Sequence, residues 1–318
     1  MKSVCLAILN YNGRKHLEHL LPTACAAAKN FSGACSILVL DNRSTENDVD
    51  WIRREFPAIE VVIAPKNDFL FSYNWLAENR SEDVMIFLNN DLRVSLNFIE
   101  ALLAHFRHDD VFAVGATSRH WDDTHFTAGP VRLKSHHGVY YWDFERQRQE
   151  LCHTLFCSGG FMAVDREKFL ELGGFNQLFM PAYGEDLDLC FRAWRRGWRC
   201  IFEPTSVVYH RESASFSEVG SSRSAHLIQR AQFLFQWASL PLAAGWIERS
   251  VIQLLFAFRR LRAGDTSWAT VWLRTWLEWR RVRMRYRWMK TSKEALADIQ
   301  RRIEMPVASA TFESKCRE

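Results

Sequence analysis

The sequence predicts an α/β protein with a mixed, mainly parallel sheet flanked by helices, followed by a C-terminal helical region. Short apolar runs alternate with amphipathic stretches over the first 220 residues, which is the pattern of successive βαβ units. Polar clusters directly follow several of the apolar runs. A basic segment rich in tryptophan occupies the end of the chain.

Five apolar runs predict buried strands, because parallel sheets covered on both faces carry nearly continuous hydrophobic strands. These runs span residues 3–9, 35–42, 59–64, 83–88 and 111–117. The segments between them have the apolar spacing of helices. Helices are predicted after Gly13 and over residues 49–56, 74–80 and 97–107.

The second part of the α/β region is less regular. Residues 118–150 are polar and aromatic, and we expect them to form a lid or an acceptor-binding insertion. A strand, turn and helix pattern resumes over residues 155–176, and two short strands are predicted at 199–204 and 206–210. Between them, a helix is expected to begin at Gly184 and to end near Gly197, with its apolar residues packed inward: Leu187, Phe191 and Trp194.

Charge divides the chain into two regions, predicted as domains 1–220 and 221–318. Residues 223–302 carry 16 Lys/Arg against 5 Asp/Glu, whereas residues 1–222 carry 23 against 29. The basic segment also contains seven of the 13 tryptophans. Different physical roles are therefore expected for the two regions.

The eight cysteines are scattered and form no C-x-x-C pair, so a zinc site or a disulfide framework is not expected. Reduced thiols indicate a cytoplasmic protein. The apolar run at the N-terminus is too short for a signal peptide and predicts a first strand. No uncharged apolar stretch is long enough to span a membrane.

Three polar clusters fall at the predicted carboxyl ends of strands: Asn10 and Asn12, Asp41 and Asn42, and Asn89, Asn90 and Asp91. Ligands of open α/β sheets bind outside these ends, so three clusters on one edge predict a binding site. Asp91 is a candidate ligand for Mg²⁺, which takes one or two carboxylates and completes its shell with waters and phosphate oxygens. Asn89 and Asn90 would contact those waters or a sugar. Taken alone, the cluster of Asn89, Asn90 and Asp91 fits a solvated Asx turn better than a metal site.

Two further features carry possible chemistry. Glu185 and Asp186 begin a predicted helix, where a carboxylate can serve as a general base or simply favour the positive end of the helix dipole. His210 follows an apolar strand, a position that a structural histidine also fits.

Eight motifs occur in a fixed order over residues 3–216: VCLAILNYNG, ILVLDNRSTEN, NWLAEN, VMIFLNND, CSGGFMAVDREKF, GGFN, GEDLDLCFRAWRRGW and VYHRESAS. The ordered series resembles the family-2 glycosyltransferases, which have the Rossmann-like GT-A fold. It is most similar in character to the bacterial rhamnosyltransferase-like members that build O-antigen and other surface polysaccharides.

The resemblance implies roles for individual positions. Asn10 and Asn12 match the first nucleotide-binding loop, and Asp41 with Asn42 matches the position that holds the base and ribose. Asp91 closes the metal motif, in which Asn89 replaces the usual first aspartate. Asp186 matches the catalytic base beside Glu185, and His210 matches a residue that completes the metal shell in some members. The implied cofactor is Mg²⁺ or Mn²⁺.

The segment KNDFLFSYNWLAEN departs from the family pattern. Asn67, Phe69 and Asn74 are in place, and the resemblance implies that the two asparagines help to bind the donor. Asp68 stands where glycine is usual, so a change in the loop backbone is expected, because aspartate adopts positive φ less easily.

The sequence therefore predicts an inverting glycosyltransferase that moves a hexosyl or rhamnosyl group from a nucleotide-diphosphate sugar to a glycan or lipid-linked acceptor. Two alternatives remain open: a nucleotidyltransferase that acts on sugar phosphates, and a catalytically silent carbohydrate-binding relative. The donor sugar, the acceptor and the linkage are not encoded in a recognisable way.

Tryptophans recur at helical spacing in the basic segment, at positions 268, 272, 276 and 279, with Arg274, Arg281 and Arg285 on another face. Such a helix suits an anionic membrane interface, which would place the protein at the inner face of the cell membrane. An equally weighted expectation is that the tryptophans pack on the α/β region or on a second copy of the chain. No nucleic-acid recognition motif is present.

Overall fold

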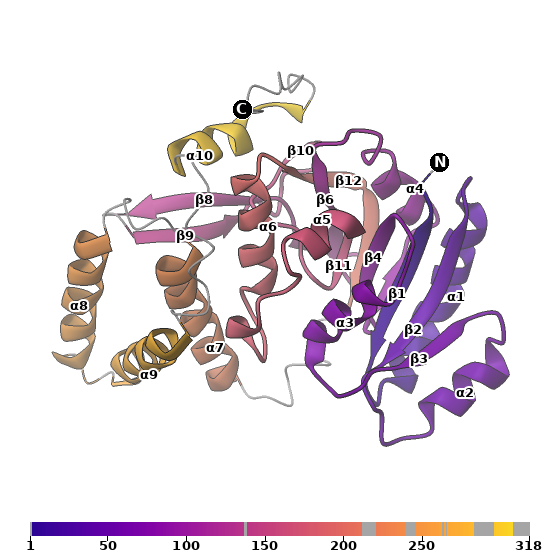
Figure 1. Ribbon diagram of the computed structural model, residues 1–318, viewed down its shortest axis with the longest axis horizontal. Helices are drawn as coiled ribbons and strands as arrows, with labels where there is room; N and C mark the ends of the chain where they lie inside the picture. Colours follow the sequence, from indigo (N-terminus) through magenta and orange to yellow (C-terminus); the bar gives the residue numbers. More distant parts are fainter. Residues whose placement is uncertain are drawn as a thin grey trace.

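The computed structural model describes residues 2–136, 139–211, 221–239, 246–262, 264, 266–282 and 296–307. Its centre is a mixed sheet with the strand order β10-β12-β6-β11-β4-β1-β2-β3 (Figure 1). The strands of this path are β1 (Val4–Asn10), β2 (Cys35–Asp41), β3 (Glu60–Ile63), β4 (Val84–Asn89), β6 (Val111–His120), β10 (Cys152–His153), β11 (Phe161–Asp165) and β12 (Arg199–His210).

Two short strands extend the sheet, and a hairpin forms a second one. Strand β5 (Leu92–Val94) pairs with β12, and β7 (Phe126–Ala128) pairs with β6. Strands β8 (Val131–His136) and β9 (Val139–Phe144) pair with each other in antiparallel fashion.

Strand direction decides which loops meet. Strands β1, β2, β3 and β4 are parallel, and β11 is antiparallel to both β4 and β6. Because β12 is parallel to β6, β12 also runs in the direction of β4. The carboxyl ends of β1, β2, β4 and β12 therefore lie along one edge of the sheet.

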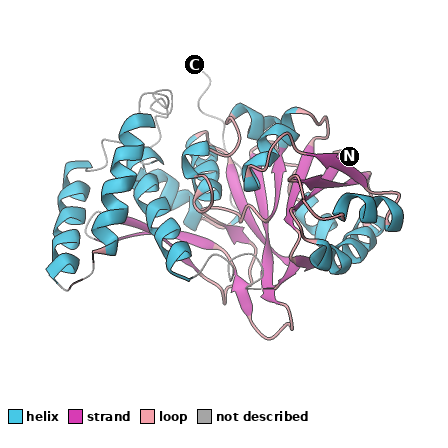
Figure 2. Ribbon diagram, turned by 90° about the horizontal axis from the view of Figure 1, so that it is seen from below, coloured by secondary structure: helices cyan, strands magenta, loops and turns pink. Residues whose placement is uncertain are grey.

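Helices cover both faces of the sheet (Figures 1 and 2). One core cluster contains residues of α1 (Arg14–Asn30), α2 (Asp48–Glu55) and α4 (Phe98–Leu103). The other contains residues of α3 (Ser72–Glu78), α5 (Arg166–Glu171) and α6 (Glu185–Arg195). The fold class predicted from the sequence is thus confirmed.

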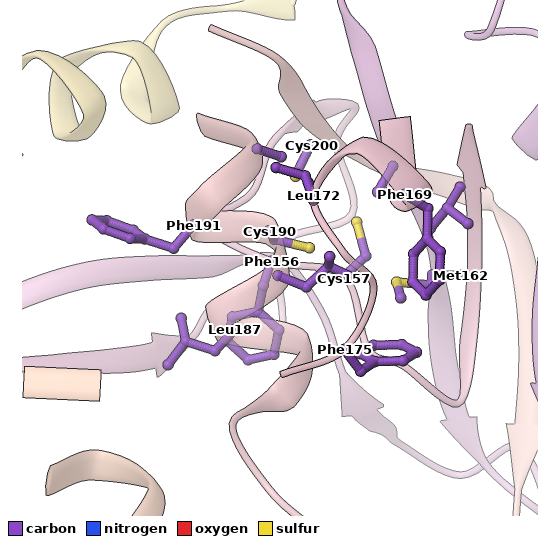
Figure 3. Packing of buried hydrophobic residues seen from close by; sticks show 14 of the residues in the cluster. Phe156, Cys157, Met162, Phe169, Leu172, Phe175, Leu187, Cys190, Phe191 and Cys200 are labelled. Atoms are coloured by element: carbon purple, nitrogen blue, oxygen red, sulfur yellow. The ribbon is translucent and has the colours of Figure 1, made fainter. Parts of the chain in front are cut away.

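Helix α6 is a central packing element. Leu187, Phe191 and Trp194 are buried as predicted, and Figure 3 shows the first two among the aromatic and aliphatic side chains around this helix. Free thiols of Cys157, Cys190 and Cys200 share this packing. Burial raises the pKa of Cys157 and Cys200 well above the ordinary value, so these two thiols are packing groups.

One prediction of two short strands near the end of the α/β region was wrong. Strand β12 is continuous from Arg199 to His210, with a register shift between Glu203 and Val207. Pro204 lies in this shift and has no backbone N–H for the ladder. A bulge accommodates it without ending the strand.

The segment 118–150 is mostly strand, as it contains the end of β6, strand β7 and the β8–β9 hairpin. Val131 and Leu133 are buried, so the hairpin forms part of the folded core. Its expected function in acceptor binding stays a prediction.

The C-terminal helices contribute to the core beside α6. They are α7 (Ser221–Leu234), a π-helical turn at Phe235–Ser239, α8 (Trp246–Arg262), α9 (Ser267–Val282) and α10 (Leu296–Glu304). Phe233, Leu234 and Phe235 are buried with residues of α6. On α10, the carbonyl of Ile303 accepts a hydrogen bond from Arg132 at 2.7 Å. The two predicted regions therefore share one hydrophobic core, and the domain boundary at 220 stays a proposal.

Among the helices of the described ranges, none has both the length and the apolar character that crossing a lipid bilayer requires.

Candidate functional site

Asn10 connects three loops at the carboxyl edge of the sheet. It pairs in register with Asp41 across β1 and β2. Its Nδ2 donates to Oδ2 of Asp48 at 2.8 Å, and its Oδ1 accepts from Nδ2 of Asn90 at 2.9 Å. The loops after β1, β2 and β4 are thus held together by one buried amide.

Asn12 and Asp41 shape the loop between β2 and α2. Asn12 has a φ of 47°, a left-handed conformation that asparagine tolerates better than most residues. Its Oδ1 accepts from the backbone N–H of Thr45 at 2.8 Å. The Asp41 carboxylate accepts from the N–H of Ser44 at 2.9 Å and from its hydroxyl at 2.5 Å. Both side chains therefore order the loop that borders the predicted nucleotide position.

The loop with the glycine-to-aspartate departure has an unexpected conformation. Asp68 has a φ of −104°, and the left-handed residue is Phe69, with a φ of 55°. The amide of Asn42 donates to the Phe69 carbonyl at 2.9 Å, and Oδ1 of Asn67 accepts from the Phe69 N–H at 3.1 Å. These two hydrogen bonds hold Phe69 in its left-handed conformation. Asp68, the residue that replaces glycine, therefore needs no positive φ.

Asn74 is engaged elsewhere. Its Nδ2 donates to the carbonyl of Phe175 at 2.8 Å, and its Oδ1 accepts from the Phe175 N–H at 2.7 Å. This pair ties α3 to the loop after α5. We assign Asn74 to folding, and its expected contact with a donor stays a prediction.

Asn89 is packed against the turn that precedes β11. The Asn89 N–H donates to the Gly160 carbonyl at 2.8 Å. A β-carbon at Gly160 would lie 2.6 Å from Nδ2 of Asn89, so glycine is needed for this approach. The same turn contains Gly159, which contacts Asp186.

Asp91 and His210, the two predicted metal ligands, lie together. Oδ2 of Asp91 is 3.3 Å from Nε2 of His210, because β5 pairs with the end of β12. Asp91 is only 4% exposed. Burial raises its pKa, but the hydrogen bond and charge of His210 and the charge of His16 lower it, and the net pKa is below the ordinary value. The carboxylate is therefore ionised at neutral pH.

This pair fits a hard divalent cation. The described residues contain no group of three histidine, cysteine or acidic side chains arranged to hold a metal. Two protein ligands suffice for Mg²⁺ or Mn²⁺ when substrate phosphate oxygens and waters supply the rest of the shell. Binding of the cation at Asp91 and His210 would thus depend on the substrate.

Glu185 and Asp186 form the first turn of α6. Oδ2 of Asp186 accepts from the N–H of Gly159 at 3.2 Å, and its Oδ1 accepts from the N–H of Leu187 at 2.8 Å. Burial raises the pKa of Asp186 to about 6. Burial, together with the charge of Asp186, raises the pKa of Glu185 to about 8. A buried carboxylate whose pKa is raised toward neutrality suits a general base.

Several residues near this edge were missed from the sequence. Asp48 accepts from the N–H of Gly13 at 2.8 Å and from Asn10. Ser44 bridges Asp41 and Asn12. The hydroxyl of Tyr73 donates to a carbonyl at 3.0 Å and accepts from the Leu88 N–H at 3.1 Å. The Ser-Thr-Glu-Asn-Asp run directly after the second strand was the available signal for Asp48.

Two arginines beside Asp91 were also missed. Arg93 lies over the rings of Trp121 and Tyr209, with its guanidinium carbon 5.0 and 4.4 Å from the centroids. Arg211 lies 4.5 Å from the Trp121 centroid. Neither arginine forms an ion pair with a carboxylate of the described residues, and Nη2 of Arg93 donates to the Trp121 carbonyl at 2.7 Å. Nothing in the local sequence marks this stack, since it joins β5, the loop after β6 and the end of β12.

The fold and this edge define a class: a GT-A-like α/β protein with amides, an ionised carboxylate–imidazole pair and a second acid pair at the ends of its strands. Residues 4–226 match the model of glycosyltransferase-like family 2, and the chain belongs to that family.

Curated relatives are distant and longer. The chain is 26% identical over 234 residues to the O-antigen biosynthesis protein RfbC of Myxococcus xanthus, which covers 66% of this chain and 17% of that protein. It is 26% identical over 151 residues to polypeptide N-acetylgalactosaminyltransferase 3 of Drosophila melanogaster, covering 42% of this chain and 22% of that protein. The chain thus spans less than a quarter of the length of these two relatives.

Solved structures share the fold. A mannosyltransferase from Pyrobaculum calidifontis, in complex with GDP-Man and Mn²⁺, superposes with a TM-score of 0.56 at 14% identity, over 87% of this chain and 86% of that one. S. aureus TarS 1–349 in complex with UDP-GlcNAc gives a TM-score of 0.55 at 13% identity, over 85% and 79%. At such identities the likeness concerns the fold.

Proposed function

We propose that the protein is an inverting glycosyltransferase that uses a nucleotide-diphosphate sugar. The observation that carries this proposal is the placement of Asp186. The Gly159–Gly160 turn touches Asp186 on one side and Asn89 on the other. This link to Asn89 at the end of β4 supports the assignment of Asp186 to the same site as Asn10, Asp41 and Asp91.

The nucleotide would bind over the ends of β1 and β2, beside Asn10 and Asp41. Family membership and nucleotide-bound structures of the same fold support this position. The loop is ordered by Asn12, Ser44 and Asp48. A preformed loop reduces the entropy that donor binding must overcome.

The diphosphate would extend toward Asp91 and His210, with Arg93 and Arg211 nearby. When bound there, Mg²⁺ or Mn²⁺ would offset negative charge on the diphosphate. The solved mannosyltransferase and the solved GalNAc-T7 were both obtained with Mn²⁺. The residues of this chain orient the leaving group and supply further positive charge.

Asp186 would accept the proton of the acceptor hydroxyl. The acceptor oxygen forms a bond to the anomeric carbon while the bond from that carbon to the diphosphate oxygen breaks. The nucleoside diphosphate leaves, and one displacement inverts the anomeric centre. The raised pKa of the neighbouring Glu185 favours its protonated form, which avoids a second negative charge beside the base.

For the transferred group we propose a hexosyl residue, with rhamnosyl as the first member to test. For the acceptor we propose a glycan or lipid-linked sugar of a surface polysaccharide. The similarity to the O-antigen biosynthesis protein supports this assignment.

A screen of nucleotide sugars by thermal shift, with and without Mn²⁺, tests the donor assignment, because a ligand that binds only the folded protein raises its melting temperature. The proposal expects one or a few UDP, GDP or dTDP sugars to stabilise the protein in a Mn²⁺-dependent manner. Release of the nucleoside diphosphate is then measured with those donors. Absence of both binding and release across the panel would contradict the proposal.

A further inference from the structure

The described tryptophan side chains of α9, those of Trp268, Trp272 and Trp276, pack against the protein. The ring of Trp268 meets Phe233 edge-on with centroids 5.0 Å apart, and Trp272 meets Trp237 at 5.8 Å. Of the four tryptophans predicted to share a face, the side chain of Trp279 lies outside the described residues. The described members pack against α7 and the turn that follows it. Their packed faces are therefore not available to a membrane.

Helix α8 is held in place by the same tryptophans. Gln253 on α8 is 3% exposed, and its Oε1 accepts from the indole N–H groups of Trp237 at 3.2 Å and Trp272 at 3.4 Å. This buried amide fixes which side of α8 faces the protein. The opposite side must consequently face outward.

That outer side is apolar. Val251, Leu254, Leu255, Phe258 and Leu261 recur at the spacing of one helical face, and their exposed fractions lie between 45% and 60%. We refer to these five residues as the α8 face. On α9, Leu273 and Leu277 are 51% and 43% exposed. A contiguous exposed apolar surface of this kind marks a binding surface in a folded protein.

The charge around the α8 face is mainly positive. Helices α8 and α9 carry seven arginines and two glutamates. Arg259, Arg260 and Arg262 are exposed in the last turn of α8, and Glu278 on α9 is paired with Arg230 at 2.8 Å. The guanidinium of Arg262 lies over the ring of Phe258, 5.9 Å from its centroid. Apolar side chains flanked by arginine complement an anionic lipid surface.

We propose that the α8 face binds the surface of an anionic lipid bilayer, with the five apolar side chains inserted at the headgroup level and the arginines on lipid phosphates. Figures 1 and 2 show α8 at the end of the molecule opposite β3 and α2, so a bilayer can meet this helix without covering the strand edge. The arginines near such a surface add an electrostatic attraction, which weakens as salt screens it. This binding requires no transferase activity and stands apart from the proposed function.

The test is flotation of the full-length chain with vesicles of phosphatidylcholine alone or of phosphatidylcholine with one third phosphatidylglycerol. We expect binding to the anionic vesicles that falls at high salt, and at least about tenfold weaker binding for the double variant Leu255→Ser/Phe258→Ser. Leu96→Ser is the matched control, because Leu96 is an exposed leucine at 58% in the α/β region. It should bind like the unchanged protein.

Three outcomes would overturn the proposal: no binding to anionic vesicles at low salt, full binding by the double variant, or equal loss in the Leu96→Ser control. Light scattering after size exclusion separates a further possibility. If the unchanged chain self-associates, the double variant is monomeric and neither binds vesicles, then the α8 face is a contact between copies. Thermal unfolding of each variant verifies that it is folded.

Discussion

The backbone N–H of Gly159 donates to Oδ2 of Asp186 at 3.2 Å. This bond joins the turn before β11 to the first turn of α6. Gly160, the next residue of the turn, accepts from the Asn89 N–H at the end of β4. Asn89 of the predicted metal motif and the candidate base thus lie on either side of one turn, although nearly a hundred residues separate them in the chain.

The pKa values of the acid pair give a pH dependence. Asp186 must be ionised to accept a proton, and burial raises its pKa to about 6. The rate of nucleoside diphosphate release should therefore fall about tenfold per pH unit well below pH 6 and level off above it. The measurement is kcat across the pH range with saturating donor. The acidic limb should be absent from the residual rate of Asp186→Asn; its persistence there would assign the limb to another group.

The raised pKa of Glu185 predicts that folding stability falls as pH rises. Its pKa rises from 4.5 to about 8 on folding, so between these values the native state holds a proton that the unfolded chain has released. Stability therefore falls as pH rises through this window. Glu185→Gln removes the free-energy cost of ionising this buried carboxyl. The melting temperature of the variant minus that of the unchanged protein should therefore increase from pH 5 to pH 9. Glu46→Gln, at an exposed position, is the control, and its difference in melting temperature should not change with pH. A difference that is equally independent of pH for Glu185→Gln would contradict the raised pKa of Glu185.

Asp91 predicts cation-dependent donor binding. Asp91→Asn removes the charge that sits 3.3 Å from His210, and donor affinity measured by calorimetry in Mn²⁺ should drop at least about tenfold. The loss should vanish when EDTA is present in both samples. Asp83→Asn serves as control, because Asp83 binds Ser3 before β4 begins, at the other edge of the sheet. Unchanged donor affinity in Asp91→Asn would remove this residue from the site.

Two glycines with positive φ form a matched pair. Gly184 and Gly173 have φ values of 86° and 78°. A β-carbon at Gly184 would lie 2.9 Å from Ala231 Cβ and from Phe179 Cδ1, whereas no heavy atom lies within 4 Å of one at Gly173. Gly173→Ala should lose only about 1–2 kcal/mol of stability from backbone strain. Gly184→Ala should lose about 1–3 kcal/mol more of stability than Gly173→Ala. It should also lower kcat, because Gly184 is the N-cap of α6. Equal losses of stability in denaturant titrations would show that the contacts at Gly184 are relieved.

Much of the fold was predictable, because the strands of a covered parallel sheet are unbroken apolar runs. The five runs of the first part correspond to β1, β2, β3, β4 and β6. The continuity of β12 was not predictable, since a proline normally marks a strand end and only the pairing with β6 shows that a bulge absorbs Pro204. Helix α4 is shorter than the predicted 97–107 and ends at Leu103.

The positions of candidate site residues at strand ends could be predicted from the sequence. Contacts between segments that are distant in the chain could not. Asp91 lies in the turn after β4 and His210 ends β12 on the same edge, so their side chains come within 3.3 Å, and their role as metal ligands stays a prediction. Arg93, Trp121 and Arg211 come from three segments, and Asn74 is occupied by Phe175, a contact over 101 residues. Likewise, periodicity placed Trp268, Trp272 and Trp276 on one face of α9, but only the packing against Phe233 and Trp237 shows that this face is inward.

The central claim is that Asp186 acts as the base of glycosyl transfer, and kcat for Asp186→Asn tests it most directly. With a donor identified by thermal shift, nucleoside diphosphate release and donor affinity are measured on the same preparation, with Glu167→Gln as a control acid in the first turn of α5. The account predicts a kcat lower by about 10²- to 10⁴-fold with donor affinity unchanged. Full activity in Asp186→Asn, with the donor still bound, would contradict it.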